Sequence, residues 1–321
     1  MKRLALHAFR RCGLFSLTRA LSANMARILM YHNFSGPGAD RDGLSEATAR
    51  EQFNYLREHF QVVPLSRIVE SLAAGKQLES HWVALTIDDG RRNCYEFLFP
   101  LLKEYRMPAT FFVVSSFIAG EDWIWTDKVL WLSELPGRAE ELASQRLPDV
   151  FQSLNRMRPE TRNRRIDEWA ALAGVSLPEQ APAKYAPCTW AELREMAGSL
   201  VEIGSHTVTH PILSSITDEE SWKELTESRR QIEEALGTQV RSFCFPNGQP
   251  EDYRASQVKE VQEAGYNCAV VADFDLVQNG ADPYRLPRIG MERKTQSVEM
   301  AKYLDGAAYY QSKLSFRAKV R

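Results

Sequence analysis

The sequence predicts an α/β protein in which a parallel sheet, closed into a barrel, carries its helices on the outside. Short apolar segments alternate along the chain with longer amphipathic ones, which is the pattern of repeated strand–helix–strand units. Acidic, histidine and amide side chains directly follow several of the apolar segments, as they do at the carboxyl-terminal rim of a barrel. With 321 residues, the chain is long enough for one such barrel.

The strands are predicted from short runs that are rich in β-branched, aromatic and other apolar residues. Four helices are predicted from apolar residues at helical spacing and from end signals, such as Thr217 as an N-cap and Gly237 as a stop. The predicted strands are residues 27–32, 83–87, 109–114, 201–204, 242–245 and 268–272, and the predicted helices are residues 46–60, 96–105, 218–236 and 253–264.

The segment 121–188 interrupts this alternation, because it is helical in pattern and rich in arginine. We interpret it as an insertion over the rim of a single barrel that spans residues 27–321. Its arginines fit a solvated helix face, with recognition of a phosphate or an acidic sugar as the alternative. Trp123 and Trp125 open the segment and Trp190 follows it. Packing explains such residues, but one of them could instead stack on a sugar ring.

Residues 1–26 form a predicted basic amphipathic helix. No acidic residue precedes Asp40, and Leu4, Ala8, Cys12 and Phe15 fall at helical spacing. This helix could pack on the protein's own surface, or residues 1–24 could rest on an anionic membrane. Arginines cut the first apolar run short of a signal peptide, so we expect a cytoplasmic protein that is peripheral on the inner membrane face at most.

The composition predicts a globular protein that does not bind nucleic acids in general. Hydrophobic residues make up 44% and charged residues 26% of the chain, and the formal net charge is −2. The five cysteines lie singly along the sequence without a CxxC pair. They therefore indicate a reducing compartment and small buried side chains rather than disulfides.

Two motifs carry the chemistry. Residues 85–90 (LTIDDG) place Asp88 and Asp89 directly after a predicted strand, and residues 204–211 (GSHTVTHP) place His206 and His210 after another. We expect the two imidazoles, four residues apart, on one side of a helical turn. Either motif alone is weak evidence, since Asp-Gly is a common turn. Together they predict a divalent metal site with a spare carboxylate, which is sufficient for hydrolysis.

These motifs resemble those of the polysaccharide deacetylases of the NodB-homology type, carbohydrate esterase family 4. Residues 86–90 are similar to the family's TFDDG motif, with Ile87 in place of Phe, and residues 206–210 to its H[ST]xxH motif. Residues 243–248 (FCFPNG) resemble its FxYPxG motif, and residues 285–289 (RLPRI) its RxPRI ending. The resemblance spans roughly residues 28–291 and implies a distorted (β/α)7–8 barrel with the helical insertion.

The resemblance also implies a set of metal ligands. Asp89, His206 and His210 would bind one divalent metal, for which we expect Zn²⁺, with Co²⁺, Ni²⁺ and Mn²⁺ as alternatives. Asp88 would stay off the metal and act as the general base. Arg288 would pair with Asp88 and keep it ionised.

Two further roles follow from the resemblance. A backbone N–H near Asn247 would help to hold the oxyanion, and Pro246 and Asn247 would contact the substrate. Family members supply a histidine near the C-terminus as the general acid, but no histidine follows His210 in this chain. Some members are circularly permuted and carry this histidine on an N-terminal YH strand, so the resemblance assigns the role to His32.

The function predicted from these residues is metal-dependent removal of N-acetyl groups from an amino sugar. The substrate would be a polysaccharide, or a lipid- or nucleotide-linked glycan precursor made inside the cell. Deformylation and O-acetyl ester hydrolysis on the same site are alternatives, because an ester alkoxide leaves more easily than an amine. A non-catalytic glycan-binding module and a membrane-recruited scaffold are the alternatives without catalysis.

Overall fold

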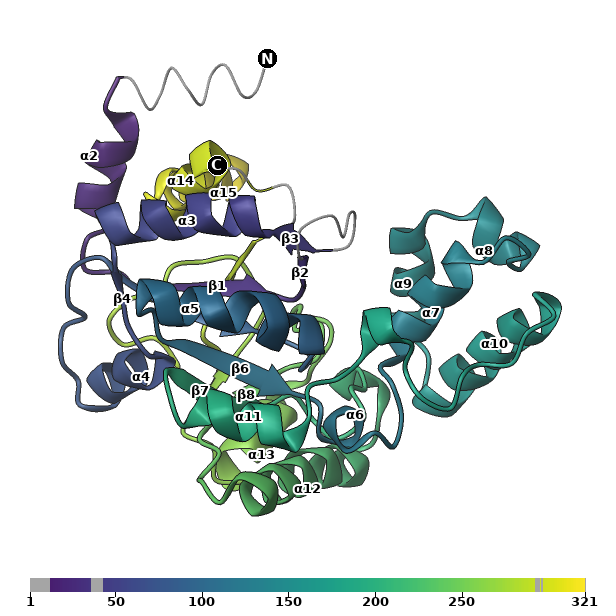
Figure 1. Ribbon diagram of the computed structural model, residues 1–321. Coiled ribbons are helices and arrows are strands. Elements are labelled where there is room, and N and C mark those ends of the chain that lie inside the picture. Colours follow the sequence, from purple (N-terminus) through teal and green to yellow (C-terminus); the bar gives the residue numbers. More distant parts are fainter. Residues whose placement is uncertain (1–11, 36–42, 292–294, 296, 321) are drawn as a thin grey trace.

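The computed structural model describes residues 12–35, 43–291, 295 and 297–320, and its centre is a parallel sheet (Figure 1). The strands run in the order β10-β1-β5-β6-β7-β8-β9, and β4 pairs with β5 beside this path. Their bounds are Arg27–Tyr31 (β1), Gln61–Val62 (β4), Trp82–Ile87 (β5), Ala109–Val113 (β6), Val201–Ser205 (β7), Ser242–Cys244 (β8), Cys268–Val270 (β9) and Ile289–Gly290 (β10). Each of the six predicted strands is present, and a separate pair, Phe34–Ser35 (β2) and Leu44–Ser45 (β3), lies outside the sheet.

The sheet closes into a distorted barrel, as the sequence predicts. Leu286 forms a parallel bridge with Val270 of β9, and three residues later Ile289 pairs with Leu29 of β1. The two edges of the sheet are thus joined through one short segment. Alternate side chains of each strand then face the barrel interior or the surrounding helices. In the register of β1 with β5, Ile28 and Ala84 belong to the inner cluster, whereas Leu29 and Leu85 belong to the outer core.

Helices surround the barrel and bury its outer face (Figure 1). Thr217 and Glu220 form a capping box at the start of α12, and Gly237 ends that helix with a left-handed φ of 69°, as the sequence predicts. The predicted helix 96–105 is less regular, because a π-helical turn (η1, Cys94–Leu98) precedes the α-helical part. The helices around the barrel are Leu14–Leu21 (α2), Glu46–His59 (α3), Leu65–Ala73 (α4), Phe99–Tyr105 (α5), Ser115–Ala119 (α6), Trp190–Ala197 (α11), Asp218–Leu236 (α12), Ala255–Glu263 (α13), Ser297–Leu304 (α14) and Ala307–Val320 (α15).

The segment predicted as an insertion forms a group of helices that projects from the barrel on the side where the strands end (Figure 1). A hydrophobic cluster of its own, which includes Val129, Leu154 and Ile166, holds these helices together. They are Trp125–Glu134 (α7), Glu140–Ser144 (α8), Leu147–Asn155 (α9) and Pro159–Leu172 (α10), with the short 3-10 helices Ala183–Tyr185 (η2) and Leu213–Ser215 (η3) farther along the chain.

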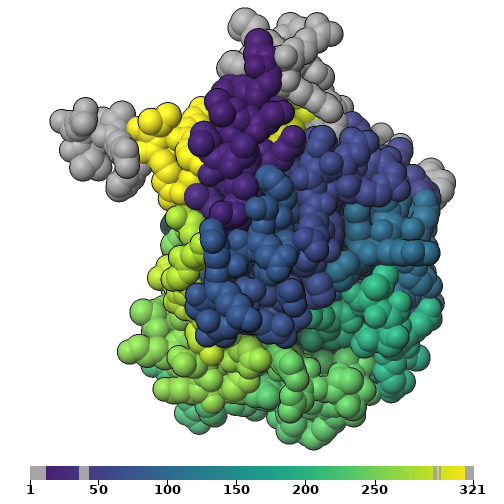
Figure 2. Space-filling view, turned by 90° about the vertical axis from the view of Figure 1, so that its left-hand side faces the viewer, coloured from purple at the N-terminus to yellow at the C-terminus, as the bar shows by residue number. Residues whose placement is uncertain are grey.

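The predicted N-terminal helix is described only in part, because residues 1–11 lie outside the described residues. Helix α2 lies beside α15 on the face shown in Figure 2. Its own side chains Phe15 and Thr18 are buried. Leu17 and Leu21 on the same helix are exposed. Within the described part of the chain, no helix has the length and hydrophobicity of a membrane span. The membrane contact of residues 1–24 stays a prediction.

Candidate active site

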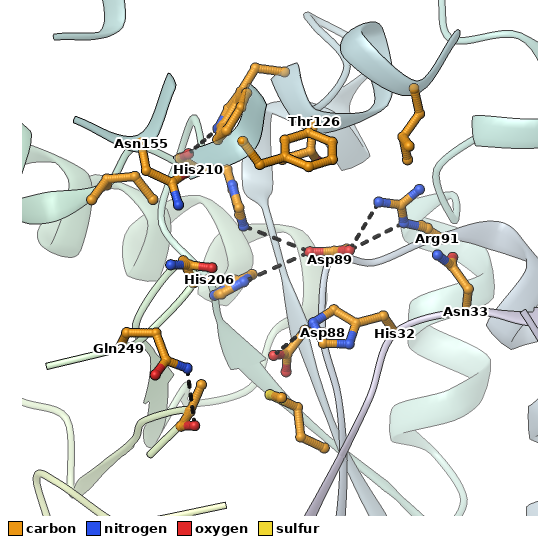
Figure 3. A pocket seen from close by; sticks show the side chains of 17 residues that line it. His32, Asn33, Asp88, Asp89, Arg91, Thr126, Asn155, His206, His210 and Gln249 are labelled. Atoms are coloured by element: carbon orange, nitrogen blue, oxygen red, sulfur yellow. Dashed lines mark hydrogen bonds and ion pairs between the residues drawn. The ribbon is translucent and has the colours of Figure 1, made fainter. Parts of the chain in front are cut away.

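The predicted site residues come together at one end of the barrel because they follow the carboxyl ends of neighbouring parallel strands. His32 follows β1, Asp88 and Asp89 follow β5, and His206 follows β7. The alignment of these strands is set by pairs such as Tyr31 with Ile87. Figure 3 shows that the side chains converge on one cavity from separate strands.

Asp89, His206 and His210 form a cluster with the dimensions of a metal site. Oδ1 of Asp89 lies 3.8 Å from Nε2 of each histidine, and all three side chains are nearly inaccessible to solvent. Tetrahedral Zn²⁺ with bonds of about 2.0–2.2 Å separates its ligands by roughly 3.4 Å, so only small movements would be needed. His206 uses its Nδ1 to contact the carbonyl oxygen of Cys244 at 2.8 Å, which fixes the ring with Nε2 toward Asp89.

The protonation states also suit a cation. Burial lowers the pKa of His206, and burial together with the neighbouring His206 lowers the pKa of His210 to about 3. Both rings are therefore neutral at physiological pH and keep a lone pair for a metal. Burial alone would raise the pKa of Asp89, but Arg91 and the imidazoles hold it below its ordinary value. The residues present thus fit a divalent metal.

A second group of potential ligands, Asp88, His206 and Cys244, shares one histidine with the first. Burial raises the pKa of the Cys244 thiol well above its ordinary value, so this side chain stays protonated and is a poor ligand. Asp88 is in addition engaged by Arg288, whose Nη1 donates to Oδ1 at 2.8 Å. The cluster around Asp89 is therefore the better metal site.

The backbone around the cluster is unusual and corrects one prediction. Residues 206–210 do not form a helical turn; they form a loop in which Thr207 and His210 have left-handed φ values of 70° and 57°. Such a φ is rare for a β-branched residue and costs conformational energy. Glu224 of α12 holds the loop by accepting hydrogen bonds from the backbone N–H groups of Val208 and Thr209. Asp89 itself has a φ of 79°.

Asp88 is buried beside the cluster and is held by Arg288. This arginine is 1% exposed, and it also donates to Oγ1 of Thr86 at 3.1 Å and to the carbonyl oxygen of Val271 at 3.0 Å. Burial would raise the pKa of Asp88, but the Arg288 guanidinium and the nearby imidazoles lower it below its usual range. Asp88 is thus a carboxylate that is free to accept a proton.

His32 faces Asp88 from the end of β1 (Figure 3). Its Nε2 lies 3.8 Å from Oδ2 of Asp88, and its side chain is 46% exposed at the mouth of the site. His81 lies at the other end of the barrel, directly before β5, and neither it nor His59 lines the cavity. His7 is outside the described residues. His32 is therefore the one histidine of the described chain, besides His206 and His210, that reaches this cavity.

The cavity above the cluster has a volume of about 400 Å³, and both the barrel and the helical segment line it. The barrel contributes Asn247 and Gln249, whereas Pro246 is buried and is not among the lining residues. Asn247 has a left-handed φ of 59°, and its side-chain amide donates to Asp252. The full lining is Met30, His32, Asn33, Asp88, Asp89, Arg91, Trp125, Thr126, Leu130, Phe151, Asn155, His206, His210, Ile212, Asn247, Gln249 and Ala272.

The tryptophans of the segment have different roles. Trp125 lines the cavity, and its indole N–H donates to the carbonyl oxygen of His210 at 3.1 Å. Trp123 packs in the core against Trp131, and Trp190 packs against the barrel helices. The prediction of a solvated arginine face is wrong for Arg162, which is 2% exposed and lies over the Trp125 ring at 4.4 Å.

Sequence reasoning missed two charged residues of the site, Arg91 and Asp127. Arg91 follows the Asp-Asp-Gly motif directly, so its position next to two carboxylates was the available signal. Asp127 gave no signal, because its contact with Arg91 joins residues that are far apart in the sequence. The amides of Asn33, Asn155 and Gln249, which also line the cavity, were not anticipated either.

Comparison with known proteins agrees with this geometry. A family model described as polysaccharide deacetylase matches residues 75–269, which is more than half of the chain. The poly-β-1,6-N-acetyl-D-glucosamine N-deacetylase of Escherichia coli K12 is 37% identical over 93 residues, which cover 28% of this chain and 14% of that protein. The chain therefore matches only a small part of this relative.

Solved structures show the same fold at low sequence identity. The Streptococcus pyogenes deacetylase PplD, solved in complex with acetate, has a TM-score of 0.61 and 16% identity, with 88% of this chain and 99% of that chain covered. IcaB from Ammonifex degensii has a TM-score of 0.60 and 19% identity, with 88% and 97% covered. From the match of the family model, together with a shared barrel, the chain belongs to the polysaccharide deacetylase family.

Proposed function

We propose that this protein is a divalent-metal-dependent hydrolase that removes the N-acetyl group from an amino sugar of a glycan. One observation carries the proposal: Asp89, His206 and His210 converge on one point, while Asp88 lies beside them and pairs with Arg288 at 2.8 Å. Glycan binding alone would need neither the three ligands nor a spare buried carboxylate.

The residues of the chain divide the reaction between them. A divalent cation held by Asp89, His206 and His210 would act as a Lewis acid toward the acyl carbonyl and would acidify a water molecule. Asp88 accepts a proton from the attacking water, and Arg288 keeps Asp88 oriented and ionised. His32, at the mouth of the cavity, donates a proton to the leaving nitrogen. A backbone N–H near Asn247 helps to hold the oxyanion.

The lining of the cavity supports a neutral sugar as the group that is bound. Neutral polar side chains, among them Asn33, Asn155 and Gln249, can hydrogen-bond to hydroxyl and acetamido groups. Arg91 is the one Arg or Lys side chain that lines the cavity among the described residues, and it is engaged by two carboxylates. We therefore expect an N-acetylglucosamine oligomer, as named for the Escherichia coli relative, to be a better substrate than a nucleotide-linked sugar.

The test is release of acetate and of free amine from β-1,6-linked N-acetylglucosamine oligomers by metal-stripped and reloaded protein. Zn²⁺, Co²⁺, Ni²⁺ and Mn²⁺ are compared, and a nucleotide-linked N-acetyl sugar is the second substrate. We expect Asp89→Asn to lose metal and activity. We expect Asp88→Asn to keep the metal and to lose about 10²–10⁴-fold in rate, which is the typical share of a general base.

Asp275→Asn is the matched control, because Asp275 pairs with Lys313 outside the cavity. Acetate release that survives both chelation and Asp88→Asn would contradict the mechanism. Formate release, or hydrolysis of O-acetyl groups alone, would favour the deformylase or esterase alternative. Tight glycan binding by a metal-free protein without turnover would identify a binding module.

A further inference from the structure

The first turn of α7 contacts the candidate ligand His210 directly and the candidate ligand Asp89 through Arg91. The indole N–H of Trp125 donates to the backbone carbonyl of His210, and both residues are buried. Two residues later, Asp127 lies 2.6 Å from Nη1 of Arg91, and its side chain has no exposed surface. One turn of α7 thus contacts the surroundings of both His210 and Asp89.

Arg91 carries the contact from Asp127 to the ligand. Its Nε and Nη2 donate to Oδ2 of Asp89 at 3.2 and 3.1 Å, while its Nη1 faces Asp127. Because Oδ2 is engaged in this way, Oδ1 of Asp89 is the oxygen that faces the two histidines (Figure 3). The guanidinium therefore selects which carboxylate oxygen is presented to a cation, and Asp127 holds the guanidinium in place.

The far end of the segment is attached to the same loop. Arg91 forms a bridge with Pro187, the backbone N–H of Cys188 donates to the carbonyl oxygen of Gly90, and that of Arg92 donates to Ala186. Gly90 has a φ of 90°, and a Cβ there would lie 2.8 Å from Cδ1 of Ile118. Both ends of the segment therefore hold the loop that carries Asp89 in one conformation.

A third contact fixes Trp125 itself. Arg162 of α10 lies over the indole ring at 4.4 Å, and its guanidinium is buried against that ring. Such a cation–π contact is strengthened where water is excluded from it. The orientation of the indole N–H toward His210 thus depends on the packing of α10 against α7.

We infer that the helical segment is the outer coordination shell of the metal site, with Trp125, Asp127 and Arg91 as positioning residues for His210 and Asp89. The inference rests on the proposed metal-dependent function. Replacement of a residue that orients a metal ligand typically lowers the metal affinity by about 10–100-fold. The segment is therefore required for metal binding as well as for lining the cavity.

The test is the dissociation constant for Co²⁺, measured in competition with a chromophoric chelator on the full chain. Trp125→Phe removes the indole N–H and keeps an aromatic ring, and Asp127→Asn replaces the carboxyl group that faces Arg91 with an amide of equal size. We expect each variant to bind Co²⁺ about 10–100-fold more weakly and to change its absorption spectrum. The matched controls are Trp222→Phe and Asp149→Asn, on exposed side chains of α12 and α9, and we expect both to bind as the parent does.

A purely structural role gives a different result. In that case the variants, measured without metal, would melt at a lower temperature than the parent protein. Their affinity for Co²⁺ and the absorption spectrum of their Co²⁺ complexes would match those of the parent, and the inference would be wrong. If Asp127→Asn does not fold, Trp125→Phe decides the question, because it keeps an aromatic ring against Arg162 and Phe151. A parent protein that binds neither Co²⁺ nor Zn²⁺ would instead overturn the proposed function, and the inference with it.

Discussion

His32 is the residue whose role depends most on the leaving group. An amine must be protonated as it leaves, whereas p-nitrophenolate leaves without a proton. We therefore expect His32→Gln to lose about 10²-fold or more in rate on an N-acetyl sugar and to change little on p-nitrophenyl acetate. Both rates are measured on the same metal-loaded protein. His59→Gln, outside the cavity, is the control. If His32→Gln lowered the rate equally on the two substrates, His32 would not be the general acid.

Arg288 and Asp88 form an ion pair in which both side chains are almost fully buried. Removing one partner leaves an uncompensated charge, so we expect Arg288→Met to lower the free energy of unfolding by about 3–5 kcal/mol. The double variant with Asp88→Asn should recover part of this loss. Urea unfolding measures both values. Arg230→Met, which breaks exposed ion pairs on α12, should cost only about 0–1 kcal/mol, and a double variant without recovery would contradict the argument.

The helical segment should open independently of the barrel. Its core around Val129, Leu154 and Ile166 is separate from the clusters of the sheet. We expect Leu154→Ala, at a fully buried site, to cost about 2–5 kcal/mol. Hydrogen exchange should then accelerate in α7, α9 and α10 and stay unchanged in β5, β6 and β7. Leu172→Ala, at an exposed site of α10, is the control, and equal acceleration in the strands would show one cooperative unit.

Elements with local end signals could be predicted from the sequence, and elements that depend on distant contacts could not. The helix 218–236 was predicted to the residue, because Thr217 and Gly237 define its ends. The loop of His206 and His210 was predicted as a helical turn, since no local preference indicates a left-handed Thr207. The ion pair of Arg91 and Asp127 could not be predicted either, because these two residues become neighbours only when the helical segment folds back onto the loop after β5.

A bound metal should stabilise the entire fold by mass action. A cation present at 100 times its dissociation constant adds about 2.7 kcal/mol to the free energy of unfolding, provided that the unfolded chain does not bind it. For a chain of this size we expect a rise in melting temperature on the order of 5 °C. Calorimetry of chelator-treated protein, with and without added Zn²⁺, measures this shift.

Variants of the two adjacent aspartates separate ligand binding from general stability. Asp89→Asn removes a ligand, so its melting temperature should not respond to Zn²⁺. Asp88→Asn leaves Arg288 buried without its carboxylate and should melt lower than the parent, yet it should keep the full shift, because Asp88 is not among the three ligands. The opposite result is a melting temperature that responds to Zn²⁺ in Asp89→Asn but not in Asp88→Asn. It would make Asp88 a ligand in place of Asp89, and Asp88, His206 and Cys244 would then be the metal ligands.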